Sequence, residues 1–198
     1  MSTTQNIHIK TSRKTLLADT MTPIGLFLKI RKNFKNSVIL ESADYHGREH
    51  GFSHIAFEPI ASFTLDQSVV IQKFPDGTEE TFVLASRQQA IIALKNFSDR
   101  FVFKKEVGDS PMANGLFGHI SYDAVQYFEK ITINPKENSL AIPEMYYAIY
   151  QNVIAINHFK NEAYIFCHSL EKSSNIGEIE QLLQVKNFAS FSFFHLSP

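Results

Sequence analysis

The stretch of sequence that decides the fold consists of Val69–Phe74, Pro75-Asp76-Gly77 and Glu80–Leu84. Two runs with strand character flank a turn in which Pro presets φ and Gly accepts a positive φ, so the stretch predicts a β-hairpin. Residues 145–157 and 163–168 predict a second, longer hairpin. Because hairpins outnumber crossovers, we expect a mostly antiparallel sheet with helices packed on one side, which is an α+β fold.

Four other segments are expected to be helical. Thr22-Pro23 is typical of a helix start, and apolar residues recur at helical spacing through residue 33. Ser86 is expected to cap a helix through Phe97, with Ile91, Ile92 and Leu94 on its apolar face. Residues 122–130 and 174–186 are the remaining candidates. Residues 52–65 predict a strand that is interrupted at Glu58-Pro59.

The composition is that of an ordinary globular protein, with 44% hydrophobic and 20% charged residues. A net charge of -1 gives no general field for nucleic acid or an acidic membrane surface. The single cysteine, Cys167, cannot form an internal disulfide, which favours a reducing cytosol, and we interpret it as a small core residue. No apolar run approaches the roughly 20 residues of a membrane span, so a cytoplasmic protein is expected.

The two ends of the chain differ in character. Residues 1–14, with Lys10, Arg13 and Lys14, are expected to form a flexible tail, and residues 15–198 a single domain. The chain finishes on an aromatic run that includes Phe188 and Phe194, whereas a natural C-terminus is usually polar. We therefore expect a truncated polypeptide; the alternative is a C-terminal edge strand docked on the core.

Glu41-Ser42 is the best candidate for a ligand site. Val38–Leu40 predicts a buried strand that ends on this carboxylate and hydroxyl. A charged group at the rim of a core needs a partner, because desolvating it alone is costly. The partner could be a ligand ammonium or an internal Lys or Arg, and the sequence does not favour one over the other.

Other candidate chemistry is weaker. His46, His50 and His54 are four residues apart, but intervening glycines favour a loop and then a strand, so we expect solvated histidines in place of a metal site. Gly115-Leu116-Phe117-Gly118 fits neither phosphate-binding pattern and is expected to let a strand approach a helix closely. Because no acid, base and nucleophile set is recognisable, a binding or regulatory domain is favoured over an enzyme.

Four blocks of sequence, in order, resemble the N-terminal domain of anthranilate synthase component I, a member of the chorismate-utilising enzymes. The blocks are Leu16–Pro23, Ile39–Ser42, Gly115–Asp123 with Tyr127–Glu129, and Pro143–Tyr147 with Val153-Ile154. The sequence departs from the family pattern at Gly51–Ala56, where an arginine is lost, and at His119 and Ser121.

The resemblance implies a function that this chain holds only in part. The family's full-length enzyme is a lyase that converts chorismate and ammonia to anthranilate and pyruvate in tryptophan biosynthesis, with ammonia supplied by a glutamine amidotransferase subunit. Its chorismate-binding catalytic domain follows this one and carries the Mg²⁺ ligands. We therefore expect no cofactor and no catalytic activity in this chain alone. The resemblance also implies feedback inhibition by L-tryptophan, with Glu41 pairing the ligand ammonium and Ser42 supplying a hydrogen bond.

Two other functions also fit these sequence features. The N-terminal domain of aminodeoxychorismate synthase component I, on the folate pathway, has the same fold, but the Glu41-Ser42 pair favours the tryptophan branch. A docking module for a glutamine amidotransferase that binds no ligand would instead show a contiguous exposed apolar patch and a non-convergent environment around Glu41. The expected partners are the chain's own catalytic domain, the amidotransferase and L-tryptophan, with no nucleic acid and no membrane.

Overall fold

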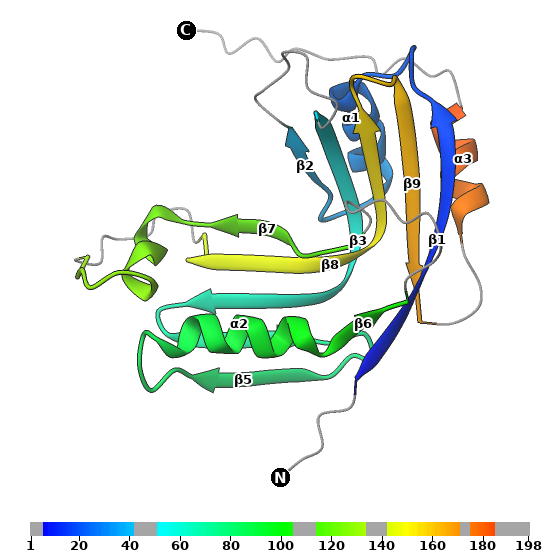
Figure 1. The fold of residues 1–198 in the computed structure, drawn as a ribbon. Helices are drawn as coiled ribbons and strands as arrows, with labels where there is room; N and C mark the ends of the chain where they lie inside the picture. Colours follow the sequence, from blue (N-terminus) through cyan, green and yellow to red (C-terminus); the bar gives the residue numbers. More distant parts are fainter. Residues whose placement is uncertain (1–5, 42–50, 105–113, 134–141, 171–174, 185–198) are drawn as a thin grey trace, which may run out of the picture.

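Two long strands, β3 (Phe52–Asp66) and β8 (Met145–Asn157), form the central pair of a bent sheet. The computed structural model describes residues 6–41, 51–104, 114–133, 142–170 and 175–184. On either side of the bend, further strands extend the sheet into an upper and a lower lobe (Figure 1). The upper lobe adds β2 (Val38–Glu41), β9 (Glu162–Ser169) and β1 (Ile7–Leu17). The lower lobe adds β4 (Val69–Lys73), β5 (Glu79–Val83) and β7 (Phe117–Ile120).

The pairing of the described strands is antiparallel except where β6 (Phe101–Phe103) runs parallel to the start of β1. This confirms the predicted α+β fold and both predicted hairpins. The predicted interruption of β3 is a bulge: Glu58 has a φ of 60°, and the register with β8 shifts between Pro59 and Ala61. A bulge bends its strand, so this point separates the two lobes.

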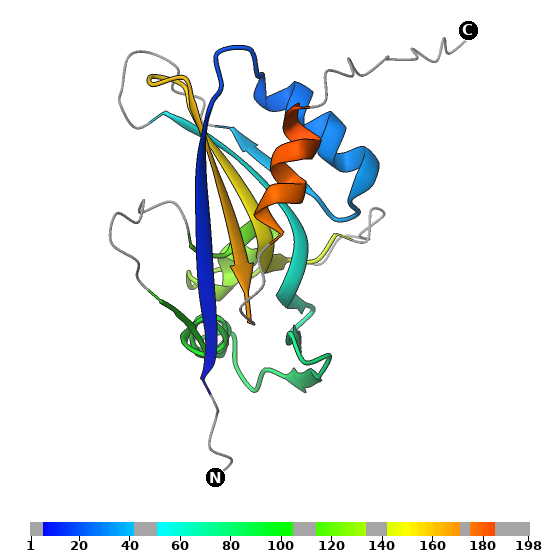
Figure 2. The same ribbon diagram turned by 90° about the vertical axis from the view of Figure 1, so that its right-hand side faces the viewer.

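The helices cover different parts of the sheet. Helices α1 (Pro23–Asn33) and α3 (Ile176–Gln184) pack on the upper lobe, and α2 (Gln89–Asp99) packs on the lower lobe. Figure 2 shows α1 and α3 on one side of the sheet and α2 on the other. The expectation of helices on one side is therefore wrong, because each lobe of the bent sheet buries a core of its own.

The predicted start of α1 is confirmed, whereas the predicted orientation of α2 is wrong. The Thr22 hydroxyl accepts a hydrogen bond from the Gly25 backbone N–H at 3.1 Å. Helix α2 begins at Gln89 without a side-chain cap, and it buries Ala90, Ala93 and Phe97. Of the predicted apolar face, Leu94 packs against the lower core, whereas Ile91 and Ile92 are turned outward and are 48% and 57% exposed.

The aromatic ring of Phe97 explains this orientation. It lies within 6 Å of the rings of Phe63, Phe74 and Phe101, at the centre of the lower core. Burying a large aromatic side chain outweighs burying one isoleucine, and alanines on the same helix face allow close approach to the sheet.

Most of the predicted N-terminal tail is a strand. Residues 7–17 pair with β9 and β6, Ile9 is fully buried, and the Thr11 hydroxyl lies 3.0 Å from His168 Nδ1. The charged residues of this segment hold surface positions: Lys14 forms an ion pair with Glu180 of α3. The tail prediction is therefore wrong from residue 7 onward, and residues 1–5 lie outside the described structure.

The two-residue turn between β3 and β4 is held by a hydrogen-bond network. Gln67 and Ser68 both have positive φ, an uncommon conformation for residues other than glycine. The Gln67 N–H donates to Glu144 Oε2 at 3.1 Å, and the Ser68 N–H donates to the Tyr127 hydroxyl at 3.3 Å. Tyr127, in the short 3-10 helix η1 (Tyr122–Tyr127), donates its own hydroxyl hydrogen to Glu144.

Gly118 lies where β7 approaches β8 most closely. A Cβ atom added there would stand 1.8 Å from the backbone oxygen of Tyr146. The close approach predicted for Gly115–Gly118 is thus confirmed at Gly118, but it is to a strand and not to a helix. No helix in the described part of the chain is long and apolar enough to cross a membrane.

We predict that Gly118→Ala lowers the free energy of unfolding by about 2–3 kcal/mol, because the added methyl group displaces backbone. Urea unfolding measures the change. Gly177→Ala in α3 is the matched control: its Cβ would meet nothing within 4 Å, so stability should stay the same or rise by about 0.5–1 kcal/mol. Equal stabilities of the two variants would contradict this account of β7.

We also predict a pH dependence that originates at Tyr127. Burial and the Glu144 carboxylate raise the pKa of Tyr127 to about 12, above the value of about 10 in an unfolded chain. The stabilisation is present below pH 10 and is lost as pH rises toward 12. Tyr127→Phe should reduce this alkaline loss of stability, followed by urea unfolding at several pH values. Tyr122→Phe, at a residue that is 86% exposed, should leave the loss unchanged.

Candidate functional site

Glu41 is the last residue of β2, at the rim of the upper lobe. It is paired in register with Ser53 of β3. The Glu41 side chain is exposed, and within the described part of the chain it forms no hydrogen bond or ion pair. Ser42, the other predicted binding residue, lies outside the described residues, as do His46 and His50.

The predicted burial of β2 is wrong. Its residues range from intermediate to exposed, and Leu40 is 41% exposed. Among the described strands it pairs only with β3, so it forms an edge of that part of the sheet. Desolvation therefore does not force a partner on Glu41, and the carboxylate is available to a ligand from solvent.

A buried hydroxyl lies beside Glu41 on the same face of the sheet. Directly opposed residues of antiparallel strands share a face, with Cβ atoms roughly 5 Å apart. The Ser53 side chain is fully buried, and its Oγ lies 2.8 Å from Nε2 of His158, in the turn after β8. The backbone N–H of His158 donates to the Gly51 carbonyl at 3.1 Å. This bond fixes the turn against the start of β3. Glu41 thus lies beside a buried Ser53–His158 contact at this rim of the lobe.

His54 occupies the opposite face of β3 from this rim. Its ring lies 6.0 Å from the rings of both Phe52 and Phe117. Burial lowers the pKa of the imidazole below its ordinary value, which favours the neutral ring. The expectation of a solvated histidine is therefore wrong for His54. Among the described residues, no group of His, Cys, Asp and Glu could hold a metal ion.

Cys167 lies in β9 and is 1% exposed, in the upper core. The interpretation of Cys167 as a small core residue is confirmed.

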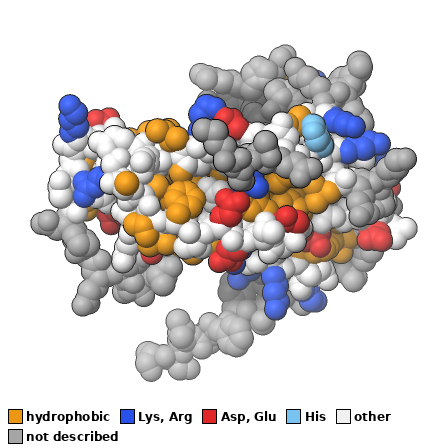
Figure 3. Space-filling model, turned by 90° about the horizontal axis from the view of Figure 1, so that it is seen from below, with side chains coloured by type: hydrophobic (Ala, Val, Ile, Leu, Met, Phe, Trp, Pro, Cys, Tyr) orange, Lys and Arg blue, Asp and Glu red, His pale blue; other side chains and the backbone are white. Residues whose placement is uncertain are grey.

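A groove separates β5 from α2, lined by apolar side chains and by the polar side chains of Gln72, Glu80, Gln89, Asn96 and Arg100. Phe82 and Leu84 line one side and Ile92 the other, around a volume of about 420 Å³. Phe82 and Ile92 are 39% and 57% exposed, and the neighbouring Val83 is 71% exposed. Figure 3 shows the molecule from below, with hydrophobic side chains gathered among charged ones. The docking-module alternative predicts such a patch, together with the open environment observed around Glu41.

Sequence reasoning gave no role to Glu144, although Pro143–Tyr147 is one of the blocks that resemble the family. Its carboxylate joins the β3–β4 turn to η1 through Gln67, Gln126 and Tyr127. Sequence reasoning also missed Lys73 and Glu79, which face a cavity on the lower lobe. The hairpin register could have identified that pair, since a turn at residues 75–77 sets these two residues opposite each other.

Comparison with known proteins identifies relatives along most of the chain. No family model matches it. The chain is 32% identical over 160 residues to anthranilate synthase component 1 of Lactococcus lactis, covering 77% of this chain and 31% of that protein. It is 26% identical over 154 residues to the Thermus thermophilus protein of the same name, covering 78% of this chain and 31% of the relative.

A crystal structure of anthranilate synthase component I from Streptococcus pneumoniae also matches, with 22% identity and a TM-score of 0.45 over 86% of this chain and 35% of that one. The chain spans about a third of the length of the curated relatives it matches. It is a homologue of the N-terminal domain of anthranilate synthase component I.

Proposed function

We propose that this chain is the regulatory, L-tryptophan-binding domain of an anthranilate synthase component I in the cytoplasm. The observation that carries the proposal is the 32% identity to anthranilate synthase component 1 along 160 residues. The four sequence blocks that resemble the family include Glu41-Ser42, which match the motif that in the family helps to bind the amino acid group of tryptophan. These blocks favour the tryptophan branch over aminodeoxychorismate synthesis.

The exposed carboxylate of Glu41 can pair with a ligand ammonium, and its open environment also fits the docking alternative. Sequence reasoning left either a ligand ammonium or an internal cation as its partner, and no described Lys or Arg pairs with it. A ligand ammonium would gain a charge-assisted hydrogen bond without breaking an existing ion pair. Ser42 remains our candidate for a further hydrogen bond to the ligand.

In this proposal the chemistry belongs to other parts of the enzyme. A chorismate-binding domain would hold Mg²⁺ and the acid–base residues that form anthranilate and pyruvate, and a glutamine amidotransferase subunit would supply ammonia. This domain would hold no cofactor and have no catalytic activity of its own. Tryptophan would inhibit by favouring a domain arrangement with a poor catalytic site, a two-state coupling of typically 1–3 kcal/mol.

A second candidate function is docking of the amidotransferase without ligand binding. The groove between β5 and α2 favours it, because contiguous exposed apolar side chains mark interaction surfaces. This function and tryptophan binding use different lobes, and a tryptophan titration separates them.

We predict saturable L-tryptophan binding that Glu41→Ala weakens about tenfold, the loss expected for one hydrogen bond to a charged group. Because the chain contains no Trp, indole fluorescence anisotropy reports the ligand alone. Indole-3-propionate, which lacks the ammonium, should bind equally to Glu41→Ala and to the unchanged chain.

Glu129→Ala is the matched control, since Glu129 is also an exposed glutamate but follows η1 on the other lobe. It should bind tryptophan as the unchanged chain does. Equal affinities of the Glu41→Ala and Glu129→Ala variants would contradict the assigned site. Absence of any tryptophan binding would leave docking as the better supported function.

A further inference from the structure

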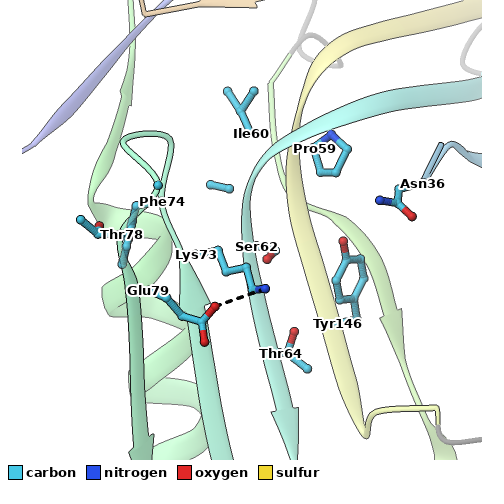
Figure 4. A pocket seen from close by; sticks show the side chains of 12 residues that line it. Asn36, Pro59, Ile60, Ser62, Thr64, Lys73, Phe74, Thr78, Glu79 and Tyr146 are labelled. Atoms are coloured by element: carbon cyan, nitrogen blue, oxygen red, sulfur yellow. Dashed lines mark ion pairs between the residues drawn. The ribbon is translucent and has the colours of Figure 1, made fainter. Parts of the chain in front are cut away.

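The lower lobe carries a cavity of about 530 Å³ on the face of the sheet that is turned away from α2 (Figure 4). Phe63 and Leu65 of β3 point into the core beneath α2, and Ser62 and Thr64, which alternate with them, line the cavity. Pro59 and Ile60 of the bulge close one end of it, where the sheet bends.

One wall of the cavity carries two opposite charges. Lys73 Nζ lies 3.2 Å from Glu79 Oε2, and the two side chains are 62% and 49% exposed. The register explains their position: Ser62 is opposite Lys73, and Lys73 is opposite Glu79, so all three share a face. An ion pair this exposed contributes little to stability, so a ligand can replace it at low cost.

Hydroxyl groups surround this ion pair. Thr64 is opposite Tyr146 in the register, which places both beside the row of Ser62 and Lys73. The Tyr146 hydroxyl interacts with the hydroxyl of the buried Tyr150, four residues further along β8. Figure 4 shows the hydroxyls of Ser62 and Thr64 beside the end of the Lys73 side chain, whereas the Tyr146 hydroxyl points toward Asn36.

The opposite side of the cavity adds an amide group and apolar surface. Asn36, which precedes β2, contributes a side-chain amide there, and Pro59 and Ile60 contribute apolar surface. The cavity therefore offers one cation, one anion, several hydroxyls and an apolar end. Its volume falls within the range of about 300–1,000 Å³ that is usual for small-molecule sites.

We propose that this cavity binds a free α-amino acid, with its carboxylate at Lys73 and its ammonium at Glu79. Only a zwitterion satisfies both charges: a simple anion would face Glu79 unpaired, and a simple cation would face Lys73 unpaired. The hydroxyls of Ser62 and Thr64 donate further hydrogen bonds to the carboxylate, and the ligand side chain lies toward Pro59 and Ile60. This site lies on the other lobe from Glu41.

The test is a ¹⁵N–¹H NMR titration of the whole chain with a mixture of the standard L-amino acids other than tryptophan. We expect saturable shifts at the backbone amides of Ser62, Thr64, Lys73 and Gly77. An equimolar mixture of acetate and methylammonium, in which the two charges are on separate molecules, should not produce them. The absence of shifts at these amides, or equal shifts with the separated ions, would overturn the inference.

Single substitutions test whether Lys73 and Glu79 bind the ligand. Lys73→Met and Glu79→Gln should each weaken binding about tenfold, because each removes a charge-assisted contact. Lys95→Met removes a lysine from another exposed ion pair, with Asp99 in α2, and should bind as the unchanged chain does. Equal losses in Lys73→Met and Lys95→Met would contradict the site.

The tryptophan titration keeps this inference separate from the proposed function. Tryptophan binding that depends on Glu41, together with no shifts around Lys73 in the amino acid mixture, would overturn the cavity site and leave the regulatory proposal standing. Tryptophan binding that is lost in Lys73→Met but kept in Glu41→Ala would support the cavity site and contradict the role assigned to Glu41.

Discussion

The antiparallel pairing of β3 with β8 is the constraint on which the rest of the structure depends. Both lobes are built on this pair, which runs from Phe52 opposite Asn157 to Leu65 opposite Met145. At the bend, the Asn152 side-chain amide donates to Glu58 Oε2 at 2.7 Å, and burial raises the pKa of the Glu58 carboxyl. A break in the strand at this point thus sets the direction of both lobes.

Local chemistry in the sequence predicted the hairpin turns and the Thr22 cap, but not the start of α2 or the faces of the elements. At the β4–β5 turn, Gly77 has a φ of 83° and Asp76 accepts a hydrogen bond from the Thr78 N–H, which are properties of the turn residues themselves. The rotation of α2 depends instead on where Phe97 fits among rings from distant strands. The strand character of β1 was hidden by Lys10 and Lys14, which occupy outward positions of a period-two pattern.

The candidate sites, too, could be predicted from the sequence only where local chemistry decides them. The sequence identified Glu41 through a resemblance, but its exposure depends on β2 having one neighbour, and tertiary pairing alone decides that. Ser53 and His158 meet because the ends of β3 and β8 are in register, although they are far apart in sequence. The Lys73–Glu79 pair, in contrast, follows from one local turn, and the residues of that hairpin are enough to place the two side chains opposite each other.

The order of the strands in the chain has a consequence for synthesis. Strand β3 is made early, and its partner β8 emerges only after β4, β5, α2 and β7. Until then one edge of β3 has no partner, and neither lobe can close its core. A ribosome pausing before Met145 would therefore present a nascent chain in which β3, β4 and β5 can already pair through their short turns, while the other edge of β3 stays open and prone to aggregation.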